Sequence, residues 1–250
     1  GKSVDHGGIK GRMEATGRGV CEALKEFFRH PEEVQRAGVS KELSEQNIII
    51  QGFGNVGLNS AKALFQNGAK IIGIAEKDGG IFNDKGINIM ELEKYKLENH
   101  TILNFPTTKT IKNSADLLYY DCDILIPAAL ENVVSLDNAD NIKAKIICEA
   151  ANGPVTYRAD QRLRKKGKVI IPDIYANAGG VTVSYFEWIR NISHIRMGRL
   201  NKRYEEHRGE AILRAIEQIS PNKLPQNMIN QLVYGANEED IISSGLEDTM

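Results

Sequence analysis

The chain has 250 residues, of which 41% are hydrophobic and 26% charged, as is usual for a folded protein with one large domain or two small ones. Its net charge of −1 at pH 7 gives no attraction to polyanions, which argues against nucleic acid and anionic membranes as partners. The three cysteines are scattered, the five histidines are dispersed, and no apolar run reaches transmembrane length. A disulfide framework, a metal site and a membrane span are therefore not expected.

The first predicted element is a helix over about residues 13–28. Apolar residues in its second half recur at helical spacing and form one face, and Pro31 follows as a stop signal. Gly17 and Gly19 lie inside the helix, where each costs ~1 kcal/mol relative to alanine. Glycines at such positions indicate a backbone pressed close to a sheet or a ligand.

From residue 47 onward, short β-branched runs alternate with amphipathic segments. Continuous apolar runs of this kind are typical of strands covered on both faces. The alternation predicts an α/β fold with a mostly parallel sheet and helices on both faces. The predicted strands are 47–50, 70–75, 123–126, 145–148 and 168–171, and the predicted helices between and after them are 56–66, 89–97, 157–166 and 181–191.

The C-terminal part has a weaker pattern. Residues 204–219 predict a charged helix, 221–226 a loop, and 241–250 the start of another helix. The fold class therefore includes a C-terminal helical extension. Two basic runs, 158–168 and 196–203, are interpreted as solvated helix faces rather than binding patches.

The most specific motif is the glycine-rich run 52–57, GFGNVG, between the first predicted strand and the helix after it. In this setting Gly52 permits a tight turn, Gly54 lets the backbone approach a pyrophosphate, and Gly57 lets the helix pack closely on the strand. The phosphates would meet free N–H groups at the positive end of the helix dipole. The motif predicts a dinucleotide site in a Rossmann-like, doubly wound fold, with a plain strand-to-helix turn as the alternative.

An acidic residue, Glu76, follows the second predicted strand about 20 residues after the last motif glycine. A carboxylate at this place accepts hydrogen bonds from the adenosine ribose and repels a 2′-phosphate, which favours NAD. Lys77 comes next and could offset that repulsion. NADP therefore stays open as the alternative cofactor.

Two asparagine-containing loops follow the fourth and fifth predicted strands: 151–154 (ANGP) and 177–180 (NAGG). In open α/β sheets the ligand lies in the crevice at the carboxyl ends of the strands. The amides of Asn152 and Asn177 can donate to and accept from a nicotinamide ribose and carboxamide. An asparagine–glycine pair alone is more often a plain turn, but its register with a dinucleotide fold favours the ligand.

Four segments together resemble the hexameric glutamate dehydrogenases of animal type, in the glutamate, leucine, phenylalanine and valine dehydrogenase family. They come in family order and at family spacing. The resemblance implies oxidative deamination of L-glutamate to 2-oxoglutarate and ammonia with NAD or NADP. Another amino-acid dehydrogenase of the family and a non-catalytic nucleotide-binding module are the alternatives. The segments are 11–19 (GRMEATGRG), 51–57 (QGFGNVG), 151–154 (ANGP) and 177–188 (NAGGVTVSYFEW).

The resemblance also implies roles for single residues. Ser184, with Val181 beside it, would contact the substrate, and Ser184 favours glutamate over leucine, valine or phenylalanine. The family's catalytic lysine and aspartate belong to an N-terminal substrate domain, so no catalytic residue is expected in this chain and the chain alone is expected to be inactive. The residues implied to line the cofactor are Arg12, Thr16, Gln51, Gly52, Phe53, Gly54, Asn55, Val56, Gly57, Glu76, Ala128, Ala129, Asn152 and Asn177.

The resemblance further implies a domain organisation. Residues 1–192 would form the dinucleotide-binding domain, 193–236 a helical extension resembling a shortened antenna, and 237–250 the start of a pivot helix. The parent protein is expected to be a homo-oligomer, a hexamer. Its expected location is the mitochondrial matrix, with the cytoplasm as the alternative.

Overall fold

The computed structural model describes residues 3, 6, 8–193, 208–216, 218, 225, 229 and 238–250. The chain divides into two compact units, each described here by itself. The first, called the sheet unit below, comprises Met13–Val181 with Met250. The second, called the helical unit, comprises Gly1–Arg12 and Thr182–Thr249.

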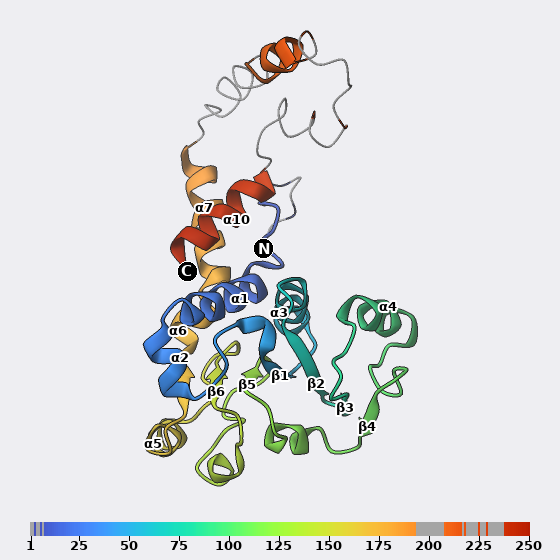
Figure 1. The fold of residues 1–250 in the computed structure, drawn as a ribbon, viewed down its shortest axis with the longest axis vertical. Helices are drawn as coiled ribbons and strands as arrows, with labels where there is room; N and C mark the ends of the chain where they lie inside the picture. Colours follow the sequence, from blue (N-terminus) through green and yellow to red (C-terminus); the bar gives the residue numbers. More distant parts are fainter. Residues whose placement is uncertain are drawn as a thin grey trace. The chain divides into compact units, whose positions relative to one another are not determined.

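The sheet unit is built on seven strands in the order β4-β3-β2-β1-β5-β6-β7 (Figure 1). Five neighbouring strands, β2, β1, β5, β6 and β7, are parallel to one another. Strands β3 and β4 are added antiparallel at the edge next to β2. Since β2 and β5 flank β1 on opposite sides, the strand order reverses at β1, where such folds bind ligands. The strands are β1 (Asn47–Gln51), β2 (Lys70–Glu76), β3 (Gly79–Phe82), β4 (Lys109–Ile111), β5 (Ile124–Pro127), β6 (Ile146–Cys148) and β7 (Val169–Ile171).

Helices cover both faces of this sheet, as predicted, and their apolar residues form two separate clusters. One face is covered mainly by α1 (Ala15–Phe28), α3 (Asn55–Gln66) and α4 (Ile89–Asn99), with α2 (Pro31–Ala37), η2 (Leu43–Glu45) and α6 (Asp173–Ala176) contributing at its margin. The other is covered by η3 (Ser114–Tyr119), η4 (Ala139–Asn141) and α5 (Tyr157–Lys165).

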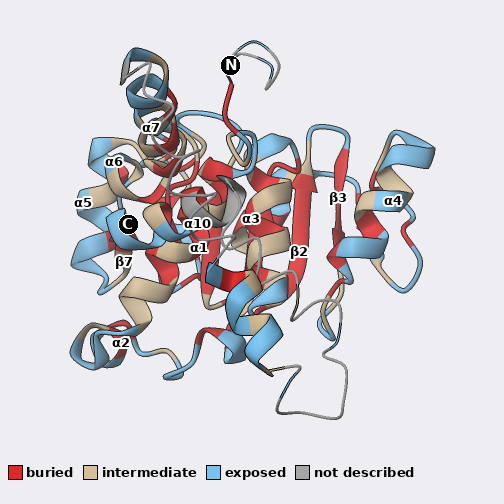
Figure 2. Ribbon diagram, turned by 90° about the horizontal axis from the view of Figure 1, so that it is seen from above, coloured by how far each residue is buried: buried red, intermediate tan, exposed pale blue. Residues whose placement is uncertain are grey.

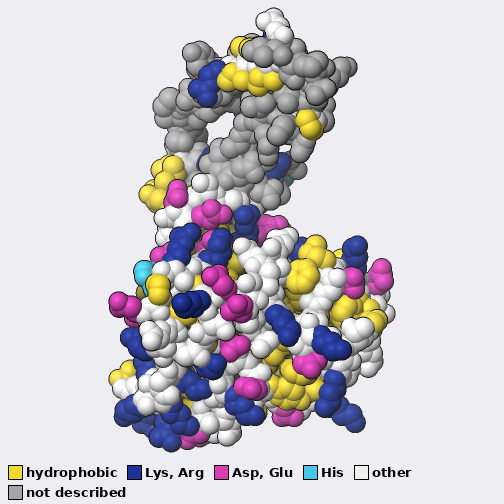
Figure 3. All heavy atoms as spheres, in the orientation of Figure 1, with side chains coloured by type: hydrophobic (Ala, Val, Ile, Leu, Met, Phe, Trp, Pro, Cys, Tyr) yellow, Lys and Arg dark blue, Asp and Glu magenta, His cyan; other side chains and the backbone are white. Residues whose placement is uncertain are grey.

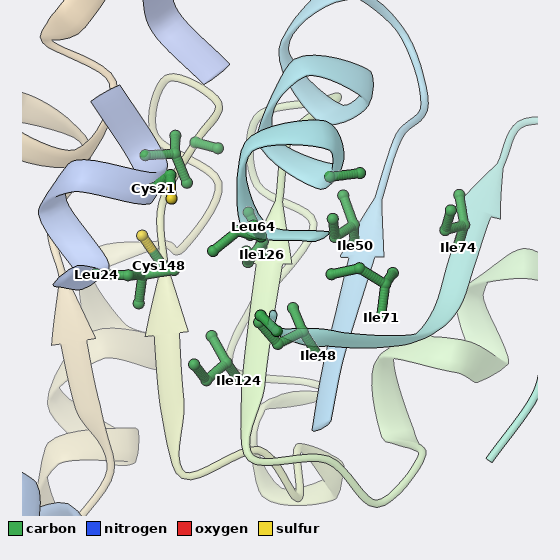
Figure 4. Close-up of a cluster of buried hydrophobic side chains, with 14 of the residues drawn as sticks. Cys21, Leu24, Ile48, Ile50, Leu64, Ile71, Ile74, Ile124, Ile126 and Cys148 are labelled. Atoms are coloured by element: carbon green, nitrogen blue, oxygen red, sulfur yellow. The ribbon is translucent and has the colours of Figure 1, made fainter. Parts of the chain in front are cut away.

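The strands form where the sequence has continuous apolar runs because both faces of the sheet are covered. In β1, Ile48 and Ile50 point into the cluster beneath α1 and α3, and Ile49 points into the opposite cluster. All three are fully buried, and Figure 2 shows the strands as the buried layer between helices with exposed outer faces. Figure 4 shows the first cluster, where Leu24 of α1 and Leu64 of α3 meet the strand residues.

In the helical unit, α7 (Gly179–Ser193, of which residues 182–193 belong here) and α10 (Glu238–Thr249) are the two long helices described. They are in contact where Gly245 faces the ring of Phe186. Residues 208–216 are also helical. Most of the segment predicted as a shortened antenna, the basic run 196–203 and most of the loop 221–226 lie outside the described residues.

Two strands, β3 and β4, and two short helices, α2 and α6, lie outside the predicted elements. The run that forms β3 begins with Gly79 and Gly80, and glycine is depleted in strands, so its β-propensity is low. The sequence nevertheless contains a signal, because the pair Asp78-Gly79 after a strand is typical of a hairpin. Pro31 does follow the end of α1, but it also starts α2, because proline is well suited to the first helical position.

The basic run 158–168 lies largely on α5, and Figure 3 shows Lys and Arg side chains gathered there. Arg162 and Lys166 pair with Asp140, and Arg164 pairs with Asp160. These pairs are exposed and contribute little to stability, which agrees with a solvated helix face. Within the described ranges, no helix is both long enough and apolar enough to cross a membrane.

Candidate functional site

The glycine run at the end of β1 forms a loop that is closed on one side and open on the other. Gly52 has a φ of +96°, and a Cβ there would lie 2.7 Å from the Cβ of Ala129. A Cβ on Gly57 would collide with the carbonyl oxygen of Gly52. A Cβ on Gly54, in contrast, would meet no atom of the described residues within 4 Å. The loop is therefore packed tightly against β1 and β5, while the backbone at Gly54 faces open space.

Helix α3 begins directly after this loop, at Asn55, with Gly54 as its N-cap. The first N–H groups of a helix have no partner within it, and the helix dipole makes this end positive. No acidic side chain occupies the first turn of α3. The side chain of Asn55 turns aside and donates to the carbonyl oxygen of Met13 at 2.8 Å. The geometry thus fits an anion such as a pyrophosphate at Gly54.

Glu76, at the end of β2, is in contact with the glycine loop. Its carboxylate accepts a hydrogen bond from the backbone N–H of Phe53 and forms an ion pair with Lys96 of α4 at 3.4 Å. Lys96 also donates to the carbonyl oxygen of Phe53 at 2.7 Å. The side chains of Glu76 and Lys96 are 21% and 28% exposed, so both remain accessible to a ligand.

Lys96 was missed in the sequence, where Lys77 had been considered as the neighbouring cation. The sequence contains no direct signal for Lys96, because α4 brings it to Glu76 across the fold. The side chain of Phe53 is buried in the core, with the Lys96 ammonium 5.3 Å from its ring centroid. Of the residues expected to line the cofactor, Phe53 therefore presents its backbone rather than its ring.

The end of β5 lies beside the glycine loop. The backbone N–H of Ala128 donates to the carbonyl oxygen of Gln51 at 2.7 Å, and Ala129 contacts Gly52. The side-chain oxygen of Gln51 is buried and accepts no hydrogen bond from any residue that the structure describes. A buried acceptor of this kind is costly to leave unpaired, and this atom is enclosed by the protein rather than open to solvent.

The two asparagines predicted at the site lie side by side. The Nδ2 group of Asn177 donates to the Oδ1 atom of Asn152 at 2.7 Å and to the carbonyl oxygen of Ala151 at 3.3 Å. Asn152 lies in the loop after β6. Asn177 is the C-cap of α6, and 179–180 form the start of α7 rather than a loop. The contact joins the carboxyl ends of β6 and β7.

A residue that the sequence did not single out, Glu149, lies beneath these loops. It follows β6 directly and is only 7% exposed. Its carboxylate accepts hydrogen bonds from the backbone N–H groups of Val155 at 3.2 Å and Asp173 at 3.0 Å. Burial raises the pKa of the Glu149 carboxyl above its usual range, although the hydrogen bond from the Asp173 backbone opposes this.

The remaining expected site residues are divided between the two units. In the sheet unit, Thr16 lies in the first turn of α1 with its hydroxyl against Gly180, and Val181 is 73% exposed. In the helical unit, Arg12 forms an ion pair with Glu187 at 3.2 Å, and Ser184 lies on α7, partly buried.

The cysteines and acidic residues do not form a metal centre in the part of the chain that is described. No group of three or more His, Cys, Asp or Glu side chains is placed to hold an ion there. All three cysteines are free and buried. Burial raises the pKa of Cys21 and of Cys122 to about 12, which keeps both thiols protonated and unreactive near neutral pH.

The chain is similar to known proteins over its whole length. The family model described as Glutamate/Leucine/Phenylalanine/Valine dehydrogenase matches residues 7–240. Over the whole chain, the mitochondrial glutamate dehydrogenase of Dictyostelium discoideum is 49% identical, and a probable glutamate dehydrogenase of Sinorhizobium fredii is 40% identical. The chain spans about half the length of these relatives, 50% and 56% respectively.

A solved structure of glutamate dehydrogenase from Peptoniphilus asaccharolyticus is also similar. It is 32% identical to this chain, with a TM-score of 0.63. The match covers 100% of this chain and 54% of that one. The fold described above therefore occurs in a glutamate dehydrogenase, over about half of its length.

Proposed function

Because the chain belongs to the glutamate, leucine, phenylalanine and valine dehydrogenase family, we propose that it is the cofactor-binding half of an NAD(P)-dependent glutamate dehydrogenase. The observation that carries the proposal is the glycine loop. It is packed against β1 and β5 at Gly52 and Gly57, and it is open at Gly54, where α3 begins. A pyrophosphate requires this combination of a tight turn, close backbone approach and a helix N-terminus.

In this proposal the nicotinamide, when bound, accepts the hydride from the α-carbon of glutamate, and the chain's own residues supply geometry. The backbone around Gly54 holds the pyrophosphate, and Glu76 accepts from the adenosine ribose. Asn152 and Asn177 orient the nicotinamide half, and Gln51 lines the site at the end of β1. Acid–base groups come from the substrate domain that the resemblance implies.

Glutamate is the proposed substrate because Ser184 matches the family position that contacts its side-chain carboxylate. Ammonia and 2-oxoglutarate are then the products. We further propose a homo-hexameric parent protein located in the mitochondrial matrix, the cytoplasm being the alternative. The mitochondrial relative supports this location. The domain boundaries proposed from the sequence, 1–192, 193–236 and 237–250, remain part of the same proposal.

The 250-residue chain is expected to bind NADH and not to oxidise glutamate, because it contributes cofactor contacts and no acid–base group. The complete parent protein is expected to oxidise glutamate faster than leucine. Calorimetry with NADH on the chain, and absorbance assays of both proteins with each amino acid, measure these outcomes. Faster oxidation of leucine would reject glutamate as the substrate, and failure of the chain to bind NADH would reject the cofactor site.

NAD is proposed as the preferred cofactor over NADP, because Glu76 faces the adenosine ribose in this arrangement. Glu76→Ser is expected to raise the affinity for NADPH relative to NADH by roughly tenfold, since a carboxylate repelling the 2′-phosphate is removed while Lys96 remains. Loss of the Phe53 contact weakens both cofactors alike and cancels in the ratio. Titration with NADPH and with NADH measures this affinity ratio.

Lys96→Met is the matched control, because it removes the cation of the same pair. It is expected to lower the NADPH-to-NADH affinity ratio. An unchanged ratio in Glu76→Ser would contradict the assignment of Glu76 to the ribose.

A further inference from the structure

We propose that Glu149 and Asp173 are positioning residues, which hold the loops of Asn152 and Asn177 in the conformation that binds the nicotinamide half of the cofactor. The inference rests on the proposed function, because it assigns a role within the same site. Neither acidic residue was implicated by the sequence or by the family resemblance.

The first step is the burial of Glu149. Burying a carboxylate destabilises the fold unless its oxygens accept hydrogen bonds. Each oxygen of Glu149 accepts one backbone N–H, and the two donors belong to different segments, Val155 after β6 and Asp173 after β7. Among the residues that the structure describes, no Lys or Arg forms an ion pair with it. Its role in the fold is therefore to join these two backbones.

The second step is the return contact from Asp173. Its carboxylate accepts a hydrogen bond from the backbone N–H of Gly153 at 2.8 Å. Gly153 has a φ of +54°, a left-handed conformation that glycine adopts without strain, and it follows Asn152 directly. Glu149 thus holds the backbone of Asp173, and the side chain of Asp173 holds the turn that carries Asn152. We call these two acidic residues, Glu149 and Asp173, the clamp.

The third step connects this clamp to the asparagines. The backbone N–H of Asn177 donates to the carbonyl oxygen of Asp173 at 3.0 Å, so the clamp also fixes the helical turn that ends at Asn177. The two amide side chains then meet at 2.7 Å. An apolar residue at position 149 would suffice to fill the core, but it could not fix the relative positions of two polar loops.

The clamp lies at the carboxyl ends of β6 and β7, whereas the glycine loop and Glu76 lie at the ends of β1 and β2. The two halves of a dinucleotide are therefore separable in experiment. NADH probes both halves, and ADP, which lacks the nicotinamide and its ribose, probes the adenosine and pyrophosphate half alone. The ratio of the two affinities reports on the asparagine loops.

Glu149→Gln is isosteric, but it places an NH₂ group against one of the two N–H donors. We expect it to reduce the affinity of the 250-residue chain for NADH about tenfold while leaving ADP binding unchanged. Asp173→Ala is the second variant, with the same expected direction. It is less buried than Glu149, so it tests the proposal even where Glu149→Gln folds poorly.

Asp123→Asn is the matched control. Its carboxylate also accepts a hydrogen bond from a strand backbone N–H, that of Asn47 at 3.0 Å. However, Asp123 precedes β5 and so lies at the amino ends of the parallel strands, away from the clamp. We expect it to lower the thermal unfolding midpoint without changing the ratio of NADH affinity to ADP affinity. This separates a positioning role from a general loss of stability.

Calorimetric titration of the wild-type chain and the three variants decides the matter. The proposal is supported if the ratio of NADH affinity to ADP affinity falls in Glu149→Gln and in Asp173→Ala but not in Asp123→Asn. A native ratio in both clamp variants, or an equal loss of both ligands, overturns it and leaves the proposed function standing. If the wild-type chain binds neither ligand, the proposed function itself fails.

Discussion

Replacing Gly54 with valine is expected to abolish NADH binding while leaving the fold intact. A Cβ at Gly54 meets no atom within 4 Å in the part of the chain that the structure describes, and the backbone there has a φ of −79°, which any residue adopts. The added methyl groups would therefore occupy only the space where the proposed pyrophosphate approaches the N-terminus of α3. The loss is expected to exceed 100-fold in affinity, about 3 kcal/mol or more.

Calorimetry with NADH measures the loss, and circular dichroism with thermal unfolding tests the fold. Gly54→Ala serves as a graded control, with a smaller loss of affinity from its single methyl group. A folded Gly54→Val protein that binds NADH with native affinity would show that the phosphates bind elsewhere. A variant that fails to fold would contradict the open space at this position.

Gly17→Ala is expected to destabilise the chain by about 3 kcal/mol. A Cβ on Gly17 would lie 2.5 Å from the backbone nitrogen of Ser60 and 2.6 Å from the Cβ of Asn59, so α1 and α3 would be forced apart. These are backbone and near-backbone atoms, which no side-chain rotation can move. The two helices together cover the core beneath β1.

The sign of this effect is informative because alanine is favoured over glycine by ~1 kcal/mol in an exposed helix interior. Urea denaturation measures the free energy of unfolding. Gly54→Ala is again the control, since its added methyl group meets no neighbour, and it is expected to change stability by less than about 1 kcal/mol. Equal or greater stability in Gly17→Ala would contradict the close packing of α1 on α3.

The sequence alone was sufficient for the parallel strands and for the helices between them. Runs such as Ile48, Ile49 and Ile50 are apolar on both faces, and a strand of this pattern is stable only inside a covered sheet. The glycine run between β1 and α3 likewise predicted its own geometry, because turn, close approach and helix packing each require glycine locally. The family could be recognised for the same reason, since its motifs are contiguous.

Only the tertiary structure determined which side chains meet across the site. Lys96 reaches Glu76 because α4 packs beside β2, and Glu149 joins two loops because β6 and β7 are neighbours. The short strands β3 and β4 also depend on pairing, β3 with β2 and β4 with β3, rather than on their own propensity. Such contacts depend on strand order and helix placement. These are set by packing of the whole core, and no local pattern in the sequence encodes them.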